Sequence, residues 1–147
     1  LNLRDQFHLP GMKILQFAFG EDMPRSDYIP HNYGQNFFVY TGTHDNNTVR
    51  GWFNHDIDEG TRPRLERYIG RPLSSAEIHL ELGRMAYASV AKTAILPLQD
   101  VLALDESARM NIPASGSNNW SWRVLPSQLT DGDEGRLRQW TILYNRE

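Results

Sequence analysis

The feature that most restricts the fold is the apolar run from Met12 to Phe19, bounded by Pro10-Gly11 and Gly20. A half-exposed strand alternates apolar and polar residues, whereas this run is apolar at nearly every position. It therefore predicts a strand buried on both faces, as in a parallel sheet. Such a strand needs a covering layer on each side, which indicates an α/β architecture.

Two further apolar segments, Phe37–Tyr40 and Thr93–Leu98, predict short strands. Pro97 is unfavourable inside a central strand, so the later strand is expected to end there. Helical periodicity between them predicts helices over Arg62–Ile69 and Ser75–Lys92. This alternation predicts a parallel sheet, and three strands are too few to close an eight-stranded barrel. We therefore expect the last part of a barrel.

Capping signals set the expected ends of the longer helices. Ser74 and Glu77 have the spacing of a capping box, with Ser74 as the N-cap residue of the second helix. Thr130 precedes an acidic first turn and is expected to cap an amphipathic helix within Ser127–Arg146. The sequence shows no internal repeat, low-complexity tract or linker.

Composition excludes several classes of function. The 147 residues carry a net charge of −3, which gives no basic field for nucleic acid or anionic lipid. The chain has no cysteine, so disulfides and thiolate metal sites are excluded. No apolar run approaches the ~20 residues needed to span a membrane. No nucleic-acid or membrane partner is expected, and a cytoplasmic location is compatible with this composition.

A dense polar cluster follows directly after the second predicted strand. His44 and Asp45 lie side by side there, and Thr43 or Asn46 can cap a short helical segment over Thr48–Asn54. In parallel α/β proteins the carboxyl ends of strands point side chains into a shared crevice, where chemistry is done. The alternative is a polar turn with a capping aspartate.

Four stretches resemble the 4-α-glucanotransferases, the amylomaltase or disproportionating-enzyme family. They correspond to its sixth, seventh and eighth barrel strands and the loop that follows: Leu9–Phe19, Tyr40–Thr48, Ile95–Leu102, and Arg109–Pro113 together with Asn119–Arg123. The resemblance implies that residues 1–147 form the C-terminal portion of a TIM (β/α)8 catalytic domain, with no separate second domain. The chain departs from the family at Asn47, usually Asp, and at Ala114, usually Gly.

The resemblance also implies a reaction. A retaining 4-α-glucanotransferase transfers α-1,4-glucan segments between maltooligosaccharides and uses no cofactor. Asp45 corresponds to the family's third acidic residue and is our candidate for transition-state stabilisation, with His44 as a neighbouring donor to sugar hydroxyls. The nucleophile and the acid/base belong to the fourth and fifth strands and are expected to precede Leu1. The N-terminal remainder of the barrel is therefore an expected partner, and the chain alone is expected to be inactive.

Three further residues are candidates for substrate binding, each with a structural alternative. The Asn111 amide can bond a sugar hydroxyl or hold a turn. Gln99 lies with Asp100 at the end of the third predicted strand, where both can bind sugar or bridge loops. Phe17 and Phe19 alternate on the first predicted strand, which puts them on one face; Phe19 can then form an apolar wall of the site, or simply pack in the core.

Other readings remain open at this stage. The chain can be a non-catalytic glucan-binding module, or a structural half-barrel that pairs with another chain. Trp120 and Trp122 are expected to be packing residues. His55 and His79 have no carboxylate cluster beside them, so no metal site is expected. A cytoplasmic enzyme is expected, or a plastid one if the source is a plant or alga.

Overall fold

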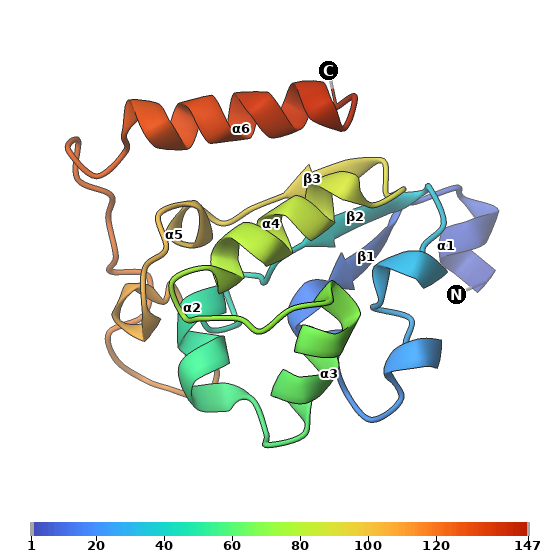
Figure 1. Cartoon of the computed structure of the whole chain (residues 1–147), viewed down its shortest axis with the longest axis horizontal. Helices are drawn as coiled ribbons and strands as arrows, with labels where there is room; N and C mark the ends of the chain where they lie inside the picture. Colours follow the sequence, from blue (N-terminus) through green and yellow to red (C-terminus); the bar gives the residue numbers. More distant parts are fainter. Residues whose placement is uncertain (1, 147) are drawn as a thin grey trace.

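The computed structural model describes residues 2–146 and contains a three-stranded parallel sheet (Figure 1). The strands are β1 (Gly11–Ile14), β2 (Phe37–Tyr40) and β3 (Thr93–Ile95), in the order β1-β2-β3. Both pairings are parallel, so the three carboxyl ends lie along one edge of the sheet. The prediction of three parallel neighbouring strands is confirmed.

Helices and turns connect the strands. In Figure 1, α4 crosses one face of the sheet, α3 lies below α4, and α6 runs along the far side of α4. None of the helices within residues 2–146 is long and apolar enough to cross a membrane. The α-helices are α1 (Asn2–Gln6), α2 (Val49–Gly51), α3 (Thr61–Ile69), α4 (Ile78–Ala88), α5 (Leu98–Val101) and α6 (Asp131–Leu143). The 3-10 turns are Leu15–Phe17, Met23–Arg25, Pro30–Asn32 and Glu106–Ala108, and a π-turn spans Trp52–Asp56.

The core lies between the sheet and the helices α3 and α4. Leu65 of α3 and Ile78 and Leu82 of α4 are fully buried, as is Val39 at the centre of β2. Each large apolar side chain removed from water in this way stabilises the fold by about 1.5–3 kcal/mol. The helical periodicity thus predicted the burial of Ile78 and Leu82 correctly. It also placed Val90 on the buried face, whereas Val90 lies beyond the helix end and is 57% exposed.

The prediction of one strand over Met12–Phe19 is wrong in its extent. The strand ends at Ile14, and a 3-10 turn follows over Leu15–Phe17. The turn directs the Gln16 amide inward, where it donates to the Asn47 carbonyl at 2.8 Å. Phe17 and Phe19 consequently do not share a face, because one is 48% and the other 1% exposed.

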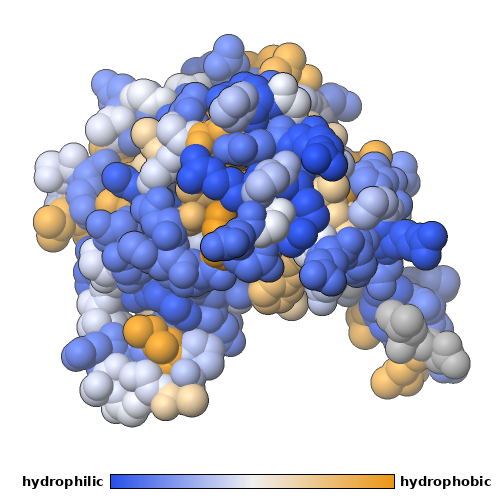
Figure 2. All heavy atoms as spheres, turned by 60° about the horizontal axis from the view of Figure 1, so that its bottom comes forward, coloured by the Kyte–Doolittle hydropathy of each residue, from blue (hydrophilic) through white to orange (hydrophobic). Residues whose placement is uncertain are grey.

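The expectation of a strand covered on both faces is also not met within the described residues. Met12 is 54% exposed and Ile95 on β3 is 37% exposed. Only one face of the sheet is covered by α3 and α4 (Figure 1). The tilted view of Figure 2 shows a largely hydrophilic face with small, separate apolar areas.

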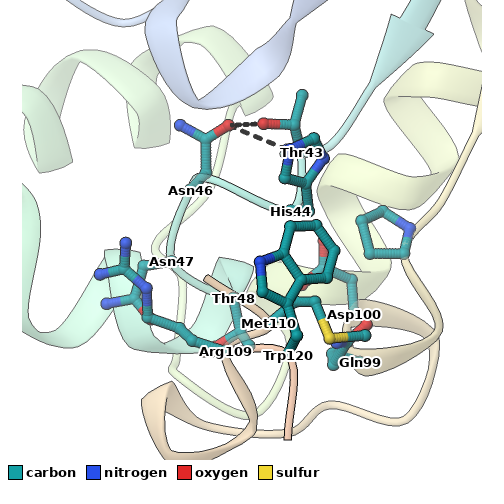
Figure 3. A pocket seen from close by; sticks show the side chains of 11 residues that line it. Thr43, His44, Asn46, Asn47, Thr48, Gln99, Asp100, Arg109, Met110 and Trp120 are labelled. Carbon is teal, nitrogen blue, oxygen red and sulfur yellow. Dashed lines mark hydrogen bonds between the residues drawn. The ribbon is translucent and has the colours of Figure 1, made fainter. Parts of the chain in front are cut away.

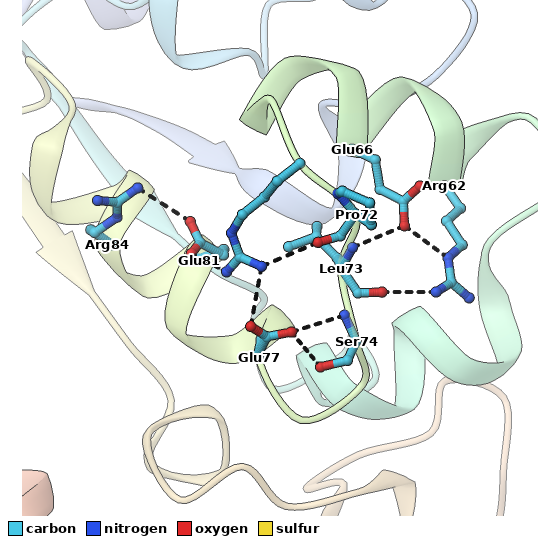
Figure 4. Close-up of polar contacts among 9 residues, drawn as sticks. Arg62, Glu66, Pro72, Leu73, Ser74, Glu77, Glu81 and Arg84 are labelled. Carbon is cyan, nitrogen blue, oxygen red and sulfur yellow. Dashed lines mark hydrogen bonds and ion pairs between the residues drawn. The ribbon is translucent and has the colours of Figure 1, made fainter.

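Helix α4 begins later than predicted, at Ile78. Ser74 donates its hydroxyl and its N–H to the Glu77 carboxylate, at 2.5 and 3.3 Å, instead of receiving the Glu77 N–H on its hydroxyl (Figure 4). Of the two bonds of the predicted capping box, only the one from the Ser74 N–H to the Glu77 side chain is present. It closes a turn that precedes the helix. Arg71 joins the same group by pairing with Glu77 and Glu81.

Helix α4 also ends early, at Ala88, because Ser89 is extended. The guanidinium of Arg146, at the far end of the chain, donates to carbonyls at this helix end, those of Ala86, Tyr87, Ser89 and Ala91. Helix α6 has the predicted Thr130 cap, completed as a capping box with Asp133. The predicted apolar residues of this helix do not all pack on one side, since Ile142 and Leu143 are 61% and 65% exposed.

Pro97 ends the third apolar segment, as expected. The strand stops at Ile95, and Pro97 is the N-cap residue of α5. Gln99 and Asp100 therefore lie in the first turn of a short helix rather than at a strand end. This turn places both side chains inward, where each is less than 10% exposed.

Candidate functional site

The loop from Thr41 to Thr48 leaves the carboxyl end of β2 and carries the predicted His44-Asp45 pair. Within it, the Asn46 side-chain oxygen accepts hydrogen bonds from the Thr43 N–H and hydroxyl, at 2.9 and 2.8 Å (Figure 3). Neither of these residues caps α2. Thr48 does so, accepting from the Gly51 N–H at 3.1 Å, which corrects the predicted cap.

Asp45 is held by residues that follow it by more than 60 positions. Its Oδ1 accepts from the Asn111 amide at 2.7 Å and lies 3.4 Å from His44 Nε2. Arg109 donates to the Asp45 carbonyl at 3.1 Å, and the Asn111 N–H donates to the His44 carbonyl at 3.1 Å. The structure thus brings together three residues that the sequence singled out: His44, Asp45 and Asn111.

The Asp45 carboxylate keeps acceptor capacity toward solvent. Its side chain is 51% exposed, and Oδ2 has no hydrogen-bond partner among the described residues. An ionised carboxylate can accept about two hydrogen bonds on each oxygen. Asn111 therefore fixes one oxygen and leaves the other available for an external donor.

A pocket of about 160 Å³ lies between this loop and the segments after β3 (Figure 3). It is smaller than a complete small-molecule site, for which about 300–1,000 Å³ is usual. No cluster of three or more potential metal ligands occurs in the described part of the chain. The pocket is lined by Thr43, His44, Asn46, Asn47, Thr48, Pro97, Gln99, Asp100, Arg109, Met110 and Trp120.

The sequence interpretation treated Trp120 as a packing residue and so missed that it lines the pocket. Its indole is 53% exposed and lies with its ring centroid 5.1 Å from that of His44. The backbone holds it in a left-handed conformation, with φ of +61° and its N–H donating to the Met110 carbonyl at 2.6 Å. The available signal was its position in the stretch Asn119–Arg123, which resembles the loop after the family's last strand.

Gln99 and Phe19 are placed differently from Asp45. Gln99 lines the pocket but is 8% exposed and donates to the Ala108 carbonyl at 3.3 Å, which is the bridging role. Phe19 is 1% exposed and packs against the rings of Trp52 and Tyr68. The 3-10 turn before it rotates its side chain into the core, so it forms no wall of this pocket.

Asn47, where the resembled family usually has Asp, is buried below the loop. Its amide donates to the Asp56 carboxylate at 3.0 Å. A carboxylate at position 47 would face that of Asp56 without a bridging proton, which is unfavourable. The amide is therefore suited to this neighbour, and the departure leaves the exposed face of the loop unchanged.

Asp100 lies beneath the loop and is 4% exposed. It accepts hydrogen bonds from the Thr41 hydroxyl at 2.5 Å and from the Val49 N–H at 2.8 Å. Burial raises the pKa of its carboxyl to about 6, against the lowering effect of these two donors. At neutral pH it is therefore a buried carboxylate with two bonds.

Comparison with known proteins gives one consistent family. The family profile of the 4-alpha-glucanotransferases, glycoside hydrolase family 77, matches residues 1–129. The chain is 45% identical over 146 residues to a 4-alpha-glucanotransferase of Streptococcus pneumoniae, and 42% identical over 150 residues to the chloroplastic/amyloplastic enzyme of Solanum tuberosum. These matches cover 99% of the chain but 28% and 25% of the relatives.

A solved structure agrees with these matches. An amylomaltase from Streptococcus agalactiae, in complex with acarbose, superimposes with a TM-score of 0.91 at 36% identity. The match covers 99% of this chain and 29% of the amylomaltase. The chain thus spans between a quarter and a third of the length of the proteins it resembles.

Proposed function

The chain belongs to the 4-alpha-glucanotransferase family, and from this we propose that it is part of an enzyme that transfers α-1,4-glucan segments between maltooligosaccharides. The observation that carries the proposal is the half-exposed Asp45 carboxylate, fixed through one oxygen by Asn111 at the carboxyl edge of a parallel sheet. This edge is where barrel enzymes keep their catalytic groups. The acarbose bound by the S. agalactiae relative supports an α-glucan ligand.

We further propose that β1, β2 and β3 are strands six to eight of a (β/α)8 barrel, and that residues 1–147 form one continuous part of its catalytic domain. The remainder of the barrel is the proposed partner of the uncovered sheet face. The exposed Met12 and Ile95 side chains support this, because a complete barrel fills its interior with such residues. The family's bacterial and plastid members support a cytoplasmic or plastid location.

In the proposed mechanism Asp45 stabilises the transition state. Retaining transfer needs a nucleophile and an acid/base about 5 Å apart, and we assign both to the parent enzyme outside these 147 residues. As positive charge develops on the sugar ring, the free Oδ2 of Asp45 accepts from ring hydroxyls. These bonds strengthen in the transition state, and that difference raises the rate.

Three neighbours complete the proposed sugar contacts. His44 lies 3.4 Å from Asp45 and presents an exposed ring that can donate to a hydroxyl. Asn111 orients the carboxylate, so its contribution comes through Asp45 as well as through any direct sugar contact. Trp120 offers an exposed flat face beside His44, suited to the C–H face of a sugar. Gln99 lines the pocket and donates to the Ala108 carbonyl, so its role is to support the pocket wall.

Assay of the complete parent enzyme on maltotriose tests the proposal. We expect release of glucose together with maltodextrins longer than maltotriose, because segments are transferred rather than hydrolysed. The isolated 147-residue chain, assayed in parallel, is expected to give neither product above the buffer control. Hydrolysis without longer products, or no turnover by the parent, would contradict the proposed reaction.

A further inference from the structure

The two ends of the His44-Asp45 loop are tied to a single buried carboxylate. Asp100 Oδ2 accepts from the Thr41 hydroxyl, where the chain leaves β2, and Oδ1 accepts from the Val49 N–H, where α2 begins. Thr41 and Val49 are both fully buried. The two donors are eight positions apart and bracket the segment that carries His44 and Asp45.

The Asp100 contacts are the only side-chain hydrogen bonds in the described residues that join both ends of this loop to one group. Gln16 adds a bond to the Asn47 carbonyl at 2.8 Å but reaches only the later half of the loop. Asn111 and Arg109 hold its exposed tip. The width of the loop at its base therefore depends on one carboxylate that is 4% exposed.

We propose that Asp100 is a positioning residue for the transfer reaction: it sets the span of the Thr41–Val49 loop and thereby the position of the Asp45 carboxylate. This inference rests on the proposed function, because it assigns Asp100 a role that acts through Asp45. Its place in α5 gives the carboxylate a rigid origin, since Pro97 starts that helix directly after β3. Burying the Asp100 carboxylate without a cationic partner is unfavourable unless it accepts hydrogen bonds, and Thr41 and Val49 donate these bonds.

Kinetics of the complete parent enzyme on maltotriose test this role. Asp100→Ala removes both bonds, and a displacement of the loop by about 1 Å is expected to lower kcat by about 10- to 100-fold with a smaller change in KM. Asp100→Asn can still accept from Val49 and contact Thr41, so it is expected to stay within about 3-fold of wild type. Asp133→Ala, which removes the Asp133 side-chain half of the α6 capping box, is the matched control for loss of stability and should leave kcat unchanged.

A double-mutant cycle separates positioning from a general structural effect. If Asp100 acts through Asp45, Asp100→Ala should lower kcat little further in an Asp45→Asn background. If the double variant instead shows the product of the two single-variant losses in kcat, the inference is overturned. A folded Asp100→Ala enzyme with wild-type kcat overturns it as well. If Asp100→Ala does not fold, Thr41→Val is measured instead, because it removes one of the two hydrogen bonds to Asp100. A fall in kcat of about 3- to 10-fold that disappears in the Asp45→Asn background supports the role. An unchanged kcat in Thr41→Val overturns it. An inactive wild-type parent would instead refute the proposed function itself.

Discussion

The loop after β2 and the helical layer of α3 and α4 are held in place by different kinds of interaction. The loop is fixed by polar bonds from Gln16, Asp100 and Asn111, each between 31 and 66 positions away in the sequence. The helical layer is fixed by fully buried apolar side chains, among them Leu65 and Leu82, and its outer surface carries partly exposed ion pairs.

Because of this difference, we expect substitutions in the two regions to affect different properties, activity for the loop and stability for the helical layer. Apolar burial is non-directional, so the helical layer can lose a methyl group and still cover the sheet. Hydrogen bonds are directional, so the position of Asp45 depends on a few distances. Substitutions in the loop should therefore change kcat more than the melting temperature, and those in the helical layer the reverse.

The largest effect is expected for Asp45→Asn in the complete parent enzyme. Asn keeps the size but removes the charge that, in the proposed mechanism, stabilises the developing cation. The activation free energy should then rise by about 3–4 kcal/mol, which lowers kcat by roughly two to three decades. KM should change much less, because the interaction is stronger in the transition state. Steady-state kinetics on maltotriose with a thermal melt measures both. Retention of more than about a third of wild-type kcat, a loss well under 1 kcal/mol, would be too small for this role.

Leu82→Ala tests the other side of the comparison. Leu82 is fully buried between α4 and the sheet, and its truncation is expected to destabilise the parent enzyme by about 2–5 kcal/mol. The melting temperature should fall, while kcat measured well below the transition should stay close to wild type. A fall in kcat as large as that of Asp45→Asn would show that the helical layer and the loop are not separable. Ile142→Ala, at an exposed position on α6, is the matched control.

Asp100 is the buried carboxylate beneath the loop, and its pKa gives a pH test of stability. The folded pKa of about 6 is raised above the ordinary value of 3.8, so the folded state holds its proton to higher pH than the unfolded state does. The contribution of Asp100 to the free energy of unfolding is therefore full below pH 4 and falls as the pH rises to 6, by about 3 kcal/mol. Asp100→Asn does not ionise and should gain stability relative to wild type over that window.

The pH test needs the difference between variant and wild type, because His79 acts in the opposite direction. Burial lowers the pKa of His79 to about 4 from 6.5, so its contribution to stability is lost as the pH falls through this range. Denaturant unfolding at pH 4 and pH 7 gives the required differences. An equal stability difference at the two pH values would contradict the raised pKa of Asp100.

Elements with a local cause were predictable from the sequence, and contacts between distant segments were not. The three parallel strands, the buried face of α4 and the Thr130 cap follow from apolar patterns and capping chemistry. The 3-10 turn after Ile14 was missed because it satisfies Gln16 through Asn47, 31 positions later. The resemblance identified His44 and Asp45, whereas the bonds of Asp100 and the exposure of Trp120 depend on how the loops meet.

The smallest effect is expected for Arg71→Ala, which removes the cation that pairs with both Glu77 and Glu81. The guanidinium pairs with Glu77 and Glu81 at 3.1 and 2.8 Å, and these carboxylates raise its pKa. Short distances alone suggest a strong contribution, but water screens the half-exposed charges of Arg71 and Glu77, and the long arginine side chain loses rotamer freedom when it pairs. The melting temperature of the parent enzyme should therefore fall by less than about 2 °C, and kcat should not change. Salt at about 1 M shortens the screening length to roughly 3 Å, so the difference from wild type should then disappear. A larger fall in melting temperature that persists in high salt would mean that Arg71 holds the α3–α4 connection by packing. The outer surface of the helical layer would then stabilise the fold by apolar contact, as its buried side does.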